Sequence, residues 1–254
     1  MGPAGTAQLI PAGNASEWTG PTGNNTWLVR GRESALVDAG VGLATHVDAV
    51  AAALGGAPLA RILITHDHSD HVTGVPALLA RWPLAIVVSQ YGISTSNRQE
   101  LAADGTSIPA GDGVLRAVAT PGHSPDHLCF FEETSGDLFC GDLVRRGGTV
   151  VIPASQGGSL RQYLASLQRM RTLAPRRLLP GHGPMIDDPV VIIDDYLAHR
   201  LERERQILEA YLAGARTPEA IVERVYVGVS DGLRKAAADS VTAHLNYLRE
   251  EGRL

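Results

Sequence analysis

The sequence has few cysteines and no long apolar run. Its 254 residues include only Cys129 and Cys140, which are too few for a disulfide framework and indicate a reducing compartment. No stretch of about 18 apolar residues lacks a charge, so no membrane-spanning helix is predicted. The first cation is Arg30, so the N-terminus does not resemble a secretory signal. We therefore expect a cytoplasmic protein without a membrane partner.

Positive charge is scarce as well. The 22 Lys and Arg residues face 27 Asp and Glu residues, which gives a formal net charge of −5. This balance excludes a strongly basic surface that would mark the protein as a binder of acidic partners, and no duplex DNA partner is expected. The pattern Gly-x-Ser-x-Gly does not occur, so the usual sign of a serine hydrolase is missing.

Strand-like and helical segments alternate over the first 188 residues. Short β-branched and aliphatic runs predict strands at 26–29, 35–37, 61–65, 85–88, 114–119, 127–131, 138–140 and 177–179. Helical spacing of apolar residues predicts helices at 44–54, from about 75, and at 159–173, where Ser159 is the expected cap. Strands mixed with helices in this order predict sheets covered by helices.

The pattern becomes helical from residue 189 onward. Helices are expected at 190–212 and 236–251, with a shorter one opened by Thr217-Pro218 between them. The charges of this region nearly balance, so it lacks the excess of Lys and Arg that binding a phosphate backbone requires. We expect a catalytic domain at 1–188 and a helical appendix at 189–254.

The most informative segment is Thr65-His66-Asp67-His68-Ser69-Asp70-His71, directly after the expected strand 61–65. Alternate residues of an extended chain point the same way, so His66, His68 and Asp70 are expected to converge. His71 is offset from that row, so Asp70 and His71 can turn towards a second ion. Imidazole and carboxylate groups are zinc ligands. The segment predicts a metal site, with a solvated polar turn as the alternative.

Three later segments each place a polar side chain beside glycine at the end of a strand. They are Pro121-Gly122-His123, Gly141-Asp142 and Gly181-His182-Gly183. Glycine allows close backbone approach or positive φ, so a ligand can be aimed from a tight turn. His46, His127 and His244 lack such a context, and we assign them to surface or core.

In order and spacing, these residues resemble the ligand signature of the metallo-β-lactamase fold superfamily over about residues 7–188. The resemblance implies an α+β, four-layer αβ/βα sandwich with two divalent ions at one edge of the sheets. Zn²⁺ is the expected metal, with Mn²⁺ or Fe²⁺ as alternatives. The implied ligands are His66, His68 and His123 for the first ion, Asp70, His71 and His182 for the second, and Asp142 bridging both.

Further segments narrow the resemblance. Leu179-Pro180-Gly181-His182-Gly183-Pro184 and the stretch from Tyr196 to Leu208 resemble the β-lactamase-like endoribonuclease subfamily. That subfamily carries a C-terminal winged-helix-like appendix, in agreement with the helical region above. Because the sequence stops at Leu254, the final wing is expected to be short or absent.

Two cations about 3.5 to 4 Å apart can hold one water between them and lower its pKa, so a bridging hydroxide is the expected nucleophile. Asp70 is the expected catalytic residue, orienting that hydroxide. Asp38, which follows the second strand, is expected to orient ligands through hydrogen bonds. Substrate contacts are expected from Arg145, Arg146, Tyr196, His199 and Arg200, for which a solvated loop or ordinary packing is the alternative.

The expected substrate is a single-stranded RNA phosphodiester, as the subfamily implies, or a thioester or ester. β-Lactamases of this fold usually carry Cys or Ser where Asp142 stands, so β-lactam hydrolysis is expected at most as a side activity. A mononuclear iron persulfide dioxygenase-like enzyme is one alternative. A helix-turn-helix binding module joined to an inactive hydrolase domain is another. The sequence leaves the oligomeric state open.

Overall fold

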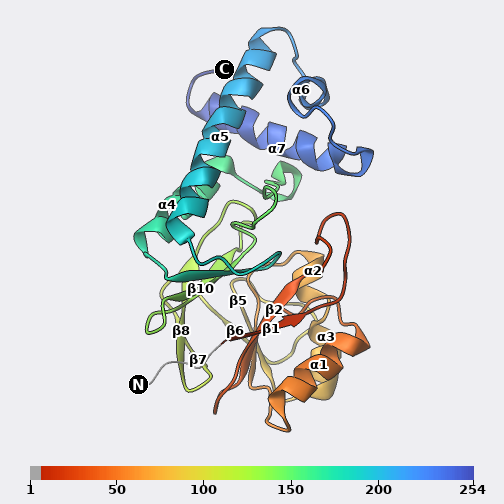
Figure 1. The fold of residues 1–254 in the computed structure, drawn as a ribbon, viewed down its shortest axis with the longest axis vertical. Helices are drawn as coiled ribbons and strands as arrows, with labels where there is room; N and C mark the ends of the chain where they lie inside the picture. The colour runs from red at the N-terminus through yellow and green to blue at the C-terminus, as the bar shows by residue number, and fades with distance from the viewer. Residues whose placement is uncertain (1–6) are drawn as a thin grey trace.

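The computed structural model describes residues 7–254 as two facing β-sheets with helices on their outer faces (Figure 1). The first sheet has the strand order β1-β2-β3-β4-β5-β6, antiparallel up to β3 and parallel from β3 onward. Its strands are β1 (Ala7–Pro11), β2 (Asn25–Val29), β3 (Ala35–Val37), β4 (Arg61–Leu63), β5 (Ile86–Ser89) and β6 (Gln99–Leu101). Ile62, Leu63 and Ile64 are fully buried, as a parallel strand covered on both faces requires.

The second sheet has the order β11-β10-β9-β8-β7, in which only β10 and β11 are parallel. Its strands are β7 (Ser107–Ala110), β8 (Gly113–Ala119), β9 (Leu128–Glu132), β10 (Asp137–Gly141) and β11 (Arg177–Pro180). Side chains of both sheets, among them Trp27, Leu63, Phe130 and Phe139, form one apolar cluster. The sheets therefore pack face to face.

Helices complete the outer layers. They are α1 (Ala44–Leu54), α2 (Ser69–Val72), α3 (Val75–Arg81), α4 (Leu160–Thr172), α5 (Pro189–Leu212), α6 (Pro218–Val225) and α7 (Asp231–Glu250), with a short 3₁₀ turn at Ala154–Gln156. Val50 of α1 and Leu78 of α3 pack on the first sheet, and Leu167 of α4 packs on the second. The predicted four-layer α+β sandwich is confirmed. Ser159 caps α4 by accepting the Gln162 N–H, as expected.

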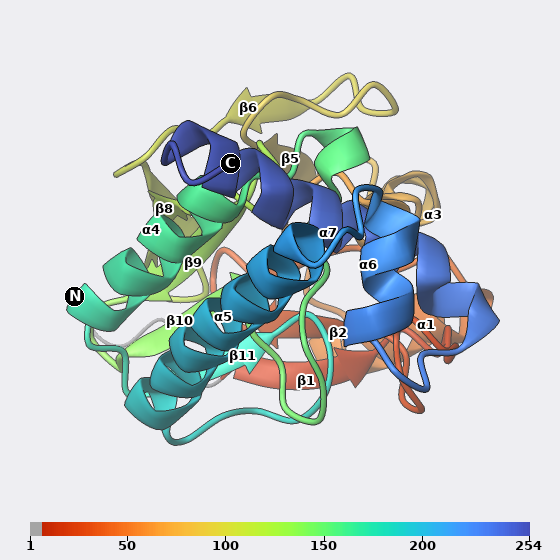
Figure 2. The same cartoon turned by 90° about the horizontal axis from the view of Figure 1, so that it is seen from above.

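The helices α6 and α7 lie above the sandwich in the view of Figure 1, and α5 runs from the sandwich up to them (Figures 1 and 2). Ile193 of α5 lies in the core of the second sheet, whereas Ile207 of the same helix lies in a separate core with α6 and α7. Residues 189–254 are all described and contain no strand, so the appendix has helices and no wing. The boundary between residues 188 and 189 stays a prediction.

The segment after β4 departs from the expected extended row. Residues 69–72 form the short helix α2, which begins directly after His68. Helical backbone ends the alternation of side chains, so Asp70 does not continue the row of His66 and His68. Asp70 instead lies in a group with His71 and His182, while His66 and His68 lie in a group with His123. Among the described residues, no helix is long and apolar enough to cross a membrane.

Candidate metal centre

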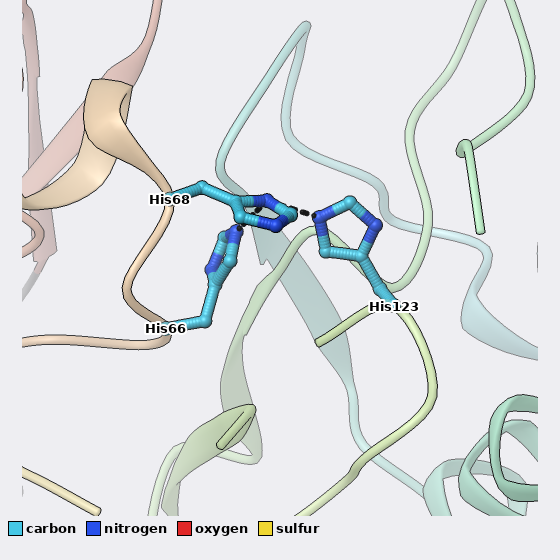
Figure 3. A group of neighbouring side chains, drawn as sticks. All are labelled: His66, His68 and His123. Atoms are coloured by element: carbon cyan, nitrogen blue, oxygen red, sulfur yellow. Dashed lines mark hydrogen bonds between the residues drawn. The ribbon is translucent and has the colours of Figure 1, made fainter. Parts of the chain in front are cut away.

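Three imidazole rings converge where the ends of the two sheets meet (Figure 3). His66 and His68 lie on the segment after β4, and His123 lies on the loop between β8 and β9. His68 Nδ1 is 3.0 Å from His66 Nε2 and 2.9 Å from His123 Nε2. The outer nitrogens of two rings have other partners: His66 Nδ1 is 3.0 Å from Thr65 Oγ1, and His123 Nδ1 donates to Val151 O at 2.7 Å. These contacts leave the inner nitrogens as lone-pair donors.

A second group consists of Asp70, His71 and His182. The turn of α2 places Asp70 and His71 beside the loop that follows β11, which carries His182. Asp70 Oδ2 is 3.4 Å from His182 Nε2 and 3.7 Å from His71 Nε2. One potential ligand atom from each residue lies within 4.8 Å of the others. His71 also lies close to the first group, since potential ligand atoms of His66, His71 and Asp142 lie within 4.8 Å of one another.

Asp142 lies between the two groups. Its Oδ2 is 3.2 Å from His182 Nε2 and 3.8 Å from His123 Nε2, and its Oδ1 is 3.6 Å from His71 Nε2. Asp142 Oδ1 is buried and has no hydrogen-bond partner within the described chain. A buried carboxylate oxygen without a donor is costly, and a cation would satisfy it.

Glycines allow the loops of the two sheets to meet this closely. A Cβ on Gly181 would lie 2.5 Å from Asp142 Oδ1 and 2.8 Å from His71 Cε1. Gly141 has a φ of 47°, and a Cβ there would lie 2.6 Å from His127 Nε2. Side chains larger than hydrogen at these two positions would therefore displace the groups that form the site.

Asp38 holds the inner segment in place, at the position where the sequence suggested an orienting carboxylate. Its Oδ2 accepts from His71 Nδ1 at 2.8 Å, and its Oδ1 accepts the Thr65 N–H at 2.9 Å. The Thr65 hydroxyl also donates to this carboxylate. The contact leaves His71 Nε2 as the lone pair facing Asp70 and Asp142.

Sequence reasoning missed three buried residues that support the site. Asn24 Nδ2 donates to Asp70 Oδ2 at 3.0 Å, and Asn25 Nδ2 donates to the carbonyls of Pro180 and Gly183 around His182. His127, which was assigned to surface or core, accepts the Asp142 N–H on Nε2 at 3.1 Å. The partners of these residues lie far away in sequence, so no local motif marks them.

Burial and neighbouring charges shift the pKa values of the clustered histidines in two directions. Burial lowers the pKa of His66 and His68 and lowers that of His123 to about 4, so these rings are neutral at neutral pH. Burial also acts to lower the pKa of His71 and His182, but facing carboxylates raise the first well above its usual value and the second to about 9.

The carboxylates of the site behave in the opposite way. Burial acts to raise the pKa of Asp70 and Asp142, but hydrogen bonds and charge from His182 and His71 lower both overall. The neutral imidazoles and ionised carboxylates together are the donor set that a divalent cation such as Zn²⁺ takes, so the residues fit a metal ion.

A cleft of about 1000 Å³ opens from the site towards the C-terminal helices. Of the expected substrate contacts, the structure places Arg145, His199 and Arg200 in its lining. Arg146 instead donates to Asp188 at 3.2 Å. The Tyr196 hydroxyl accepts the Arg145 N–H at 3.0 Å and donates to backbone carbonyls of the same loop. Neither Arg146 nor Tyr196 is part of the cleft lining.

The C-terminal helices are tied to the loop that follows β10. Arg200 of α5 donates to Val150 O, and Ser240 of α7 accepts the Ile152 N–H at 3.2 Å. The residue between them, Val151, is the one whose carbonyl accepts from His123. The appendix is therefore in contact with the segment that orients one of the clustered imidazoles.

Known proteins are similar to this chain in sequence or in fold. An atrochrysone carboxyl ACP thioesterase from Cryptosporiopsis sp. (strain 8999) is 32% identical over 251 residues, covering 91% of this chain and 76% of the relative. A protein of the same description from Aspergillus chevalieri is 33% identical over 228 residues, covering 85% and 72%. The solved structure of a metallo-beta-lactamase family protein from Thermus thermophilus superposes with a TM-score of 0.81 at 23% identity, covering 97% of this chain and 94% of that one.

A four-layer sandwich with clustered histidines and aspartates at the sheet ends is consistent with a hydrolase that binds divalent metal ions. The family model described as "Metallo-beta-lactamase superfamily" matches residues 19–182, and the model described as "Beta-lactamase associated winged helix domain" matches residues 217–254. The chain belongs to the metallo-β-lactamase superfamily and carries the associated winged-helix domain at its C-terminus.

Proposed function

We propose that this chain is a dinuclear metal-dependent hydrolase of acyl thioesters, including thioesters carried on an acyl carrier protein. The observation that carries the proposal is the convergence of seven imidazole and carboxylate side chains, five of which line a large cleft. Two relatives that match over most of their length are described as carrier-protein thioesterases, which supports this substrate class.

The ligand roles follow the geometry of the two groups. His66, His68 and His123 hold one cation, Asp70, His71 and His182 hold the other, and Asp142 lies between them. Cations bound at these positions would polarise the thioester carbonyl and lower the pKa of a bound water. Imidazole and carboxylate donors favour Zn²⁺, with Mn²⁺ and Fe²⁺ as alternatives.

Asp70 is the proposed catalytic residue of the chain. Its side chain is 28% exposed and lines the cleft, so it reaches substrate and water as well as the inner histidines. The Asn24 amide donates to its Oδ2, the same oxygen that faces His182. This fixed, ionised carboxylate orients the attacking water.

The charges of the cleft favour a thioester over RNA. Apart from the proposed ligands Asp70 and Asp142, its lining holds two acidic side chains, Glu17 and Asp67, and only two arginines, Arg145 and Arg200. Arg200 already donates to Val150 O. Most affinity for a phosphodiester backbone comes from Lys and Arg, so this lining suits a substrate that carries no row of phosphates.

Side-by-side assays test the proposal. Zinc-loaded and manganese-loaded protein is given octanoyl thioesters of N-acetylcysteamine and of an acyl carrier protein, and single-stranded RNA. We expect thioester hydrolysis that is lost on chelation and restored by metal, with RNA cleaved no faster than by chelated protein. RNA cleavage without thioester hydrolysis would contradict the proposal. Oxygen consumption with a persulfide by protein holding one iron would support the dioxygenase alternative instead.

A further inference from the structure

The wall of the cleft opposite the clustered histidines comes from the C-terminal domain. It is lined by residues of α7 and of the segment between α6 and α7, which we call the apolar wall: Tyr226, Val229, Leu233, Ala236 and Ala237. His68, Asp70 and His182 line the same cleft. One continuous space thus joins the metal centre to an apolar surface.

Helix geometry explains why this wall is apolar. Leu233, Ala236, Ala237 and Ser240 are spaced at i, i+3, i+4 and i+7, so they share one face of α7. The Ser240 hydroxyl in that row is already occupied by the Ile152 N–H. The charged residues of the helix are directed elsewhere, since Arg234 pairs with Glu223 and Asp231.

The two alanines leave depth in the wall, whereas larger side chains would fill it. Ala236 and Ala237 are 8% and 7% exposed, while Leu233 is partly exposed at the cleft. Apolar surface facing a water-filled cleft beside a reactive centre is typical of a ligand subsite.

Trp18 lines the same cleft from the N-terminal side and is 51% exposed. Its position is fixed by two contacts: Arg145 donates to Trp18 O at 3.1 Å, and the Ser230 hydroxyl donates to the neighbouring Glu17 carboxylate. Ser230 is the residue directly before α7. These contacts hold the backbone around Trp18 near the start of α7, and the exposed Trp18 side chain gives the cleft a second apolar surface.

We propose that the apolar wall and Trp18 form an acyl subsite, which binds a bulky apolar acyl group of a thioester and selects it over acetyl. This inference rests on the proposed thioester hydrolysis for its substrate class. The acyl group lies along α7 with its carbonyl at the clustered histidines, and the alanines set how large a group fits.

The test compares substrates and variants in full-length, metal-loaded protein. The substrates are the acetyl, butyryl, octanoyl and naphthoyl thioesters of N-acetylcysteamine. Each buried methylene contributes up to about four-fold in affinity, so kcat/KM should rise at least about ten-fold from acetyl to octanoyl. Ala236→Phe should reduce the octanoyl-to-acetyl ratio at least about ten-fold, and Leu233→Ala should reduce it by removing apolar surface. Lys235→Phe, at an exposed neighbour outside the cleft lining, is the matched control and should keep the wild-type ratio.

A binding measurement separates this inference from the proposed function. Calorimetry with octanoate, the product of the octanoyl thioester, should detect binding to wild type that Ala236→Phe weakens and Lys235→Phe does not. If no thioester is hydrolysed, the proposed function fails. The octanoate-binding measurement still tests whether the apolar wall and Trp18 bind an acyl group. An unchanged octanoyl-to-acetyl ratio in Ala236→Phe and Leu233→Ala, or equal octanoate binding by wild type and Ala236→Phe, would overturn the inference.

Discussion

Replacing Asp38 with Asn tests whether the carboxylate behind His71 sets the affinity for metal. Asp38 is buried, with one oxygen 2.8 Å from His71 Nδ1 and the other 2.9 Å from the Thr65 nitrogen. Its φ is 62°, a left-handed conformation that asparagine tolerates, so Asp38→Asn keeps shape and backbone. The amide has only one oxygen, so its NH₂ must face either the His71 or the Thr65 donor.

The magnitude follows from the role of such contacts. Losing the hydrogen-bond partner of a metal-bound histidine weakens metal binding about 10- to 100-fold. The same carboxylate raises the pKa of His71 well above its usual value, so the variant also has less proton competition at that ring. We therefore expect the lower part of the range, about 10- to 30-fold, which corresponds to about 1.4 to 2 kcal/mol.

Competition with a chromophoric chelator measures the effect as apparent dissociation constants for Zn²⁺. Asp112→Asn is the matched control, because Asp112 pairs with exposed Arg32 and lies outside the cleft lining. The control should bind zinc like the wild type. Affinities of Asp38→Asn within about two-fold of wild type would refute the reasoning that Asp38 acts on the metal centre through His71.

Three further predictions concern single residues. Asp70→Ala should abolish turnover of any substrate while the circular dichroism spectrum and melting curve stay close to wild type, and retained activity would show that its role is misassigned. Gly181→Ala should lower zinc stoichiometry, because the new methyl group would lie 2.5 Å from Asp142 Oδ1; full metal content would contradict the steric argument. His244 is buried, and neither ring nitrogen has a hydrogen-bond partner among residues 7–254. Burial lowers its pKa to about 3, so its protonation favours unfolding as pH falls below the unfolded value of about 6.5. Urea unfolding should therefore show His244→Leu gaining about 2 kcal/mol over wild type between pH 7 and pH 5, whereas parallel pH profiles would argue against this account.

The sequence predicted the interior strands and the edge strand β11, and it missed the other three edge strands. β2 to β5 and β8 to β11 were expected because buried strands need apolar runs. The missed strands β1, β6 and β7 are edge strands, and β6 is exposed along its whole length. β7 contains Pro109, which normally counts against a strand and is tolerated at an edge. Edge strands are defined by their neighbours more than by their own pattern.

The site was predictable wherever a motif was local. The six-residue segment from His66 to His71 and the Gly-flanked His123, Asp142 and His182 are all brought together by the fold. The helical turn at α2 was not foreseen, because the polar residues of this segment carry no apolar periodicity. Asn24 and His127 could not be found from sequence, since hydrogen bonds to Asp70 and Asp142 give them their roles.

Anomalous diffraction at the zinc absorption edge, from crystals of zinc-loaded protein, tests the central claim most directly. We predict two peaks in a wild-type crystal, one among His66, His68 and His123 and the other among Asp70, His71 and His182, with Asp142 in contact with both. No peak at these side chains, or a single peak under saturating zinc, would contradict the proposed pair of cations.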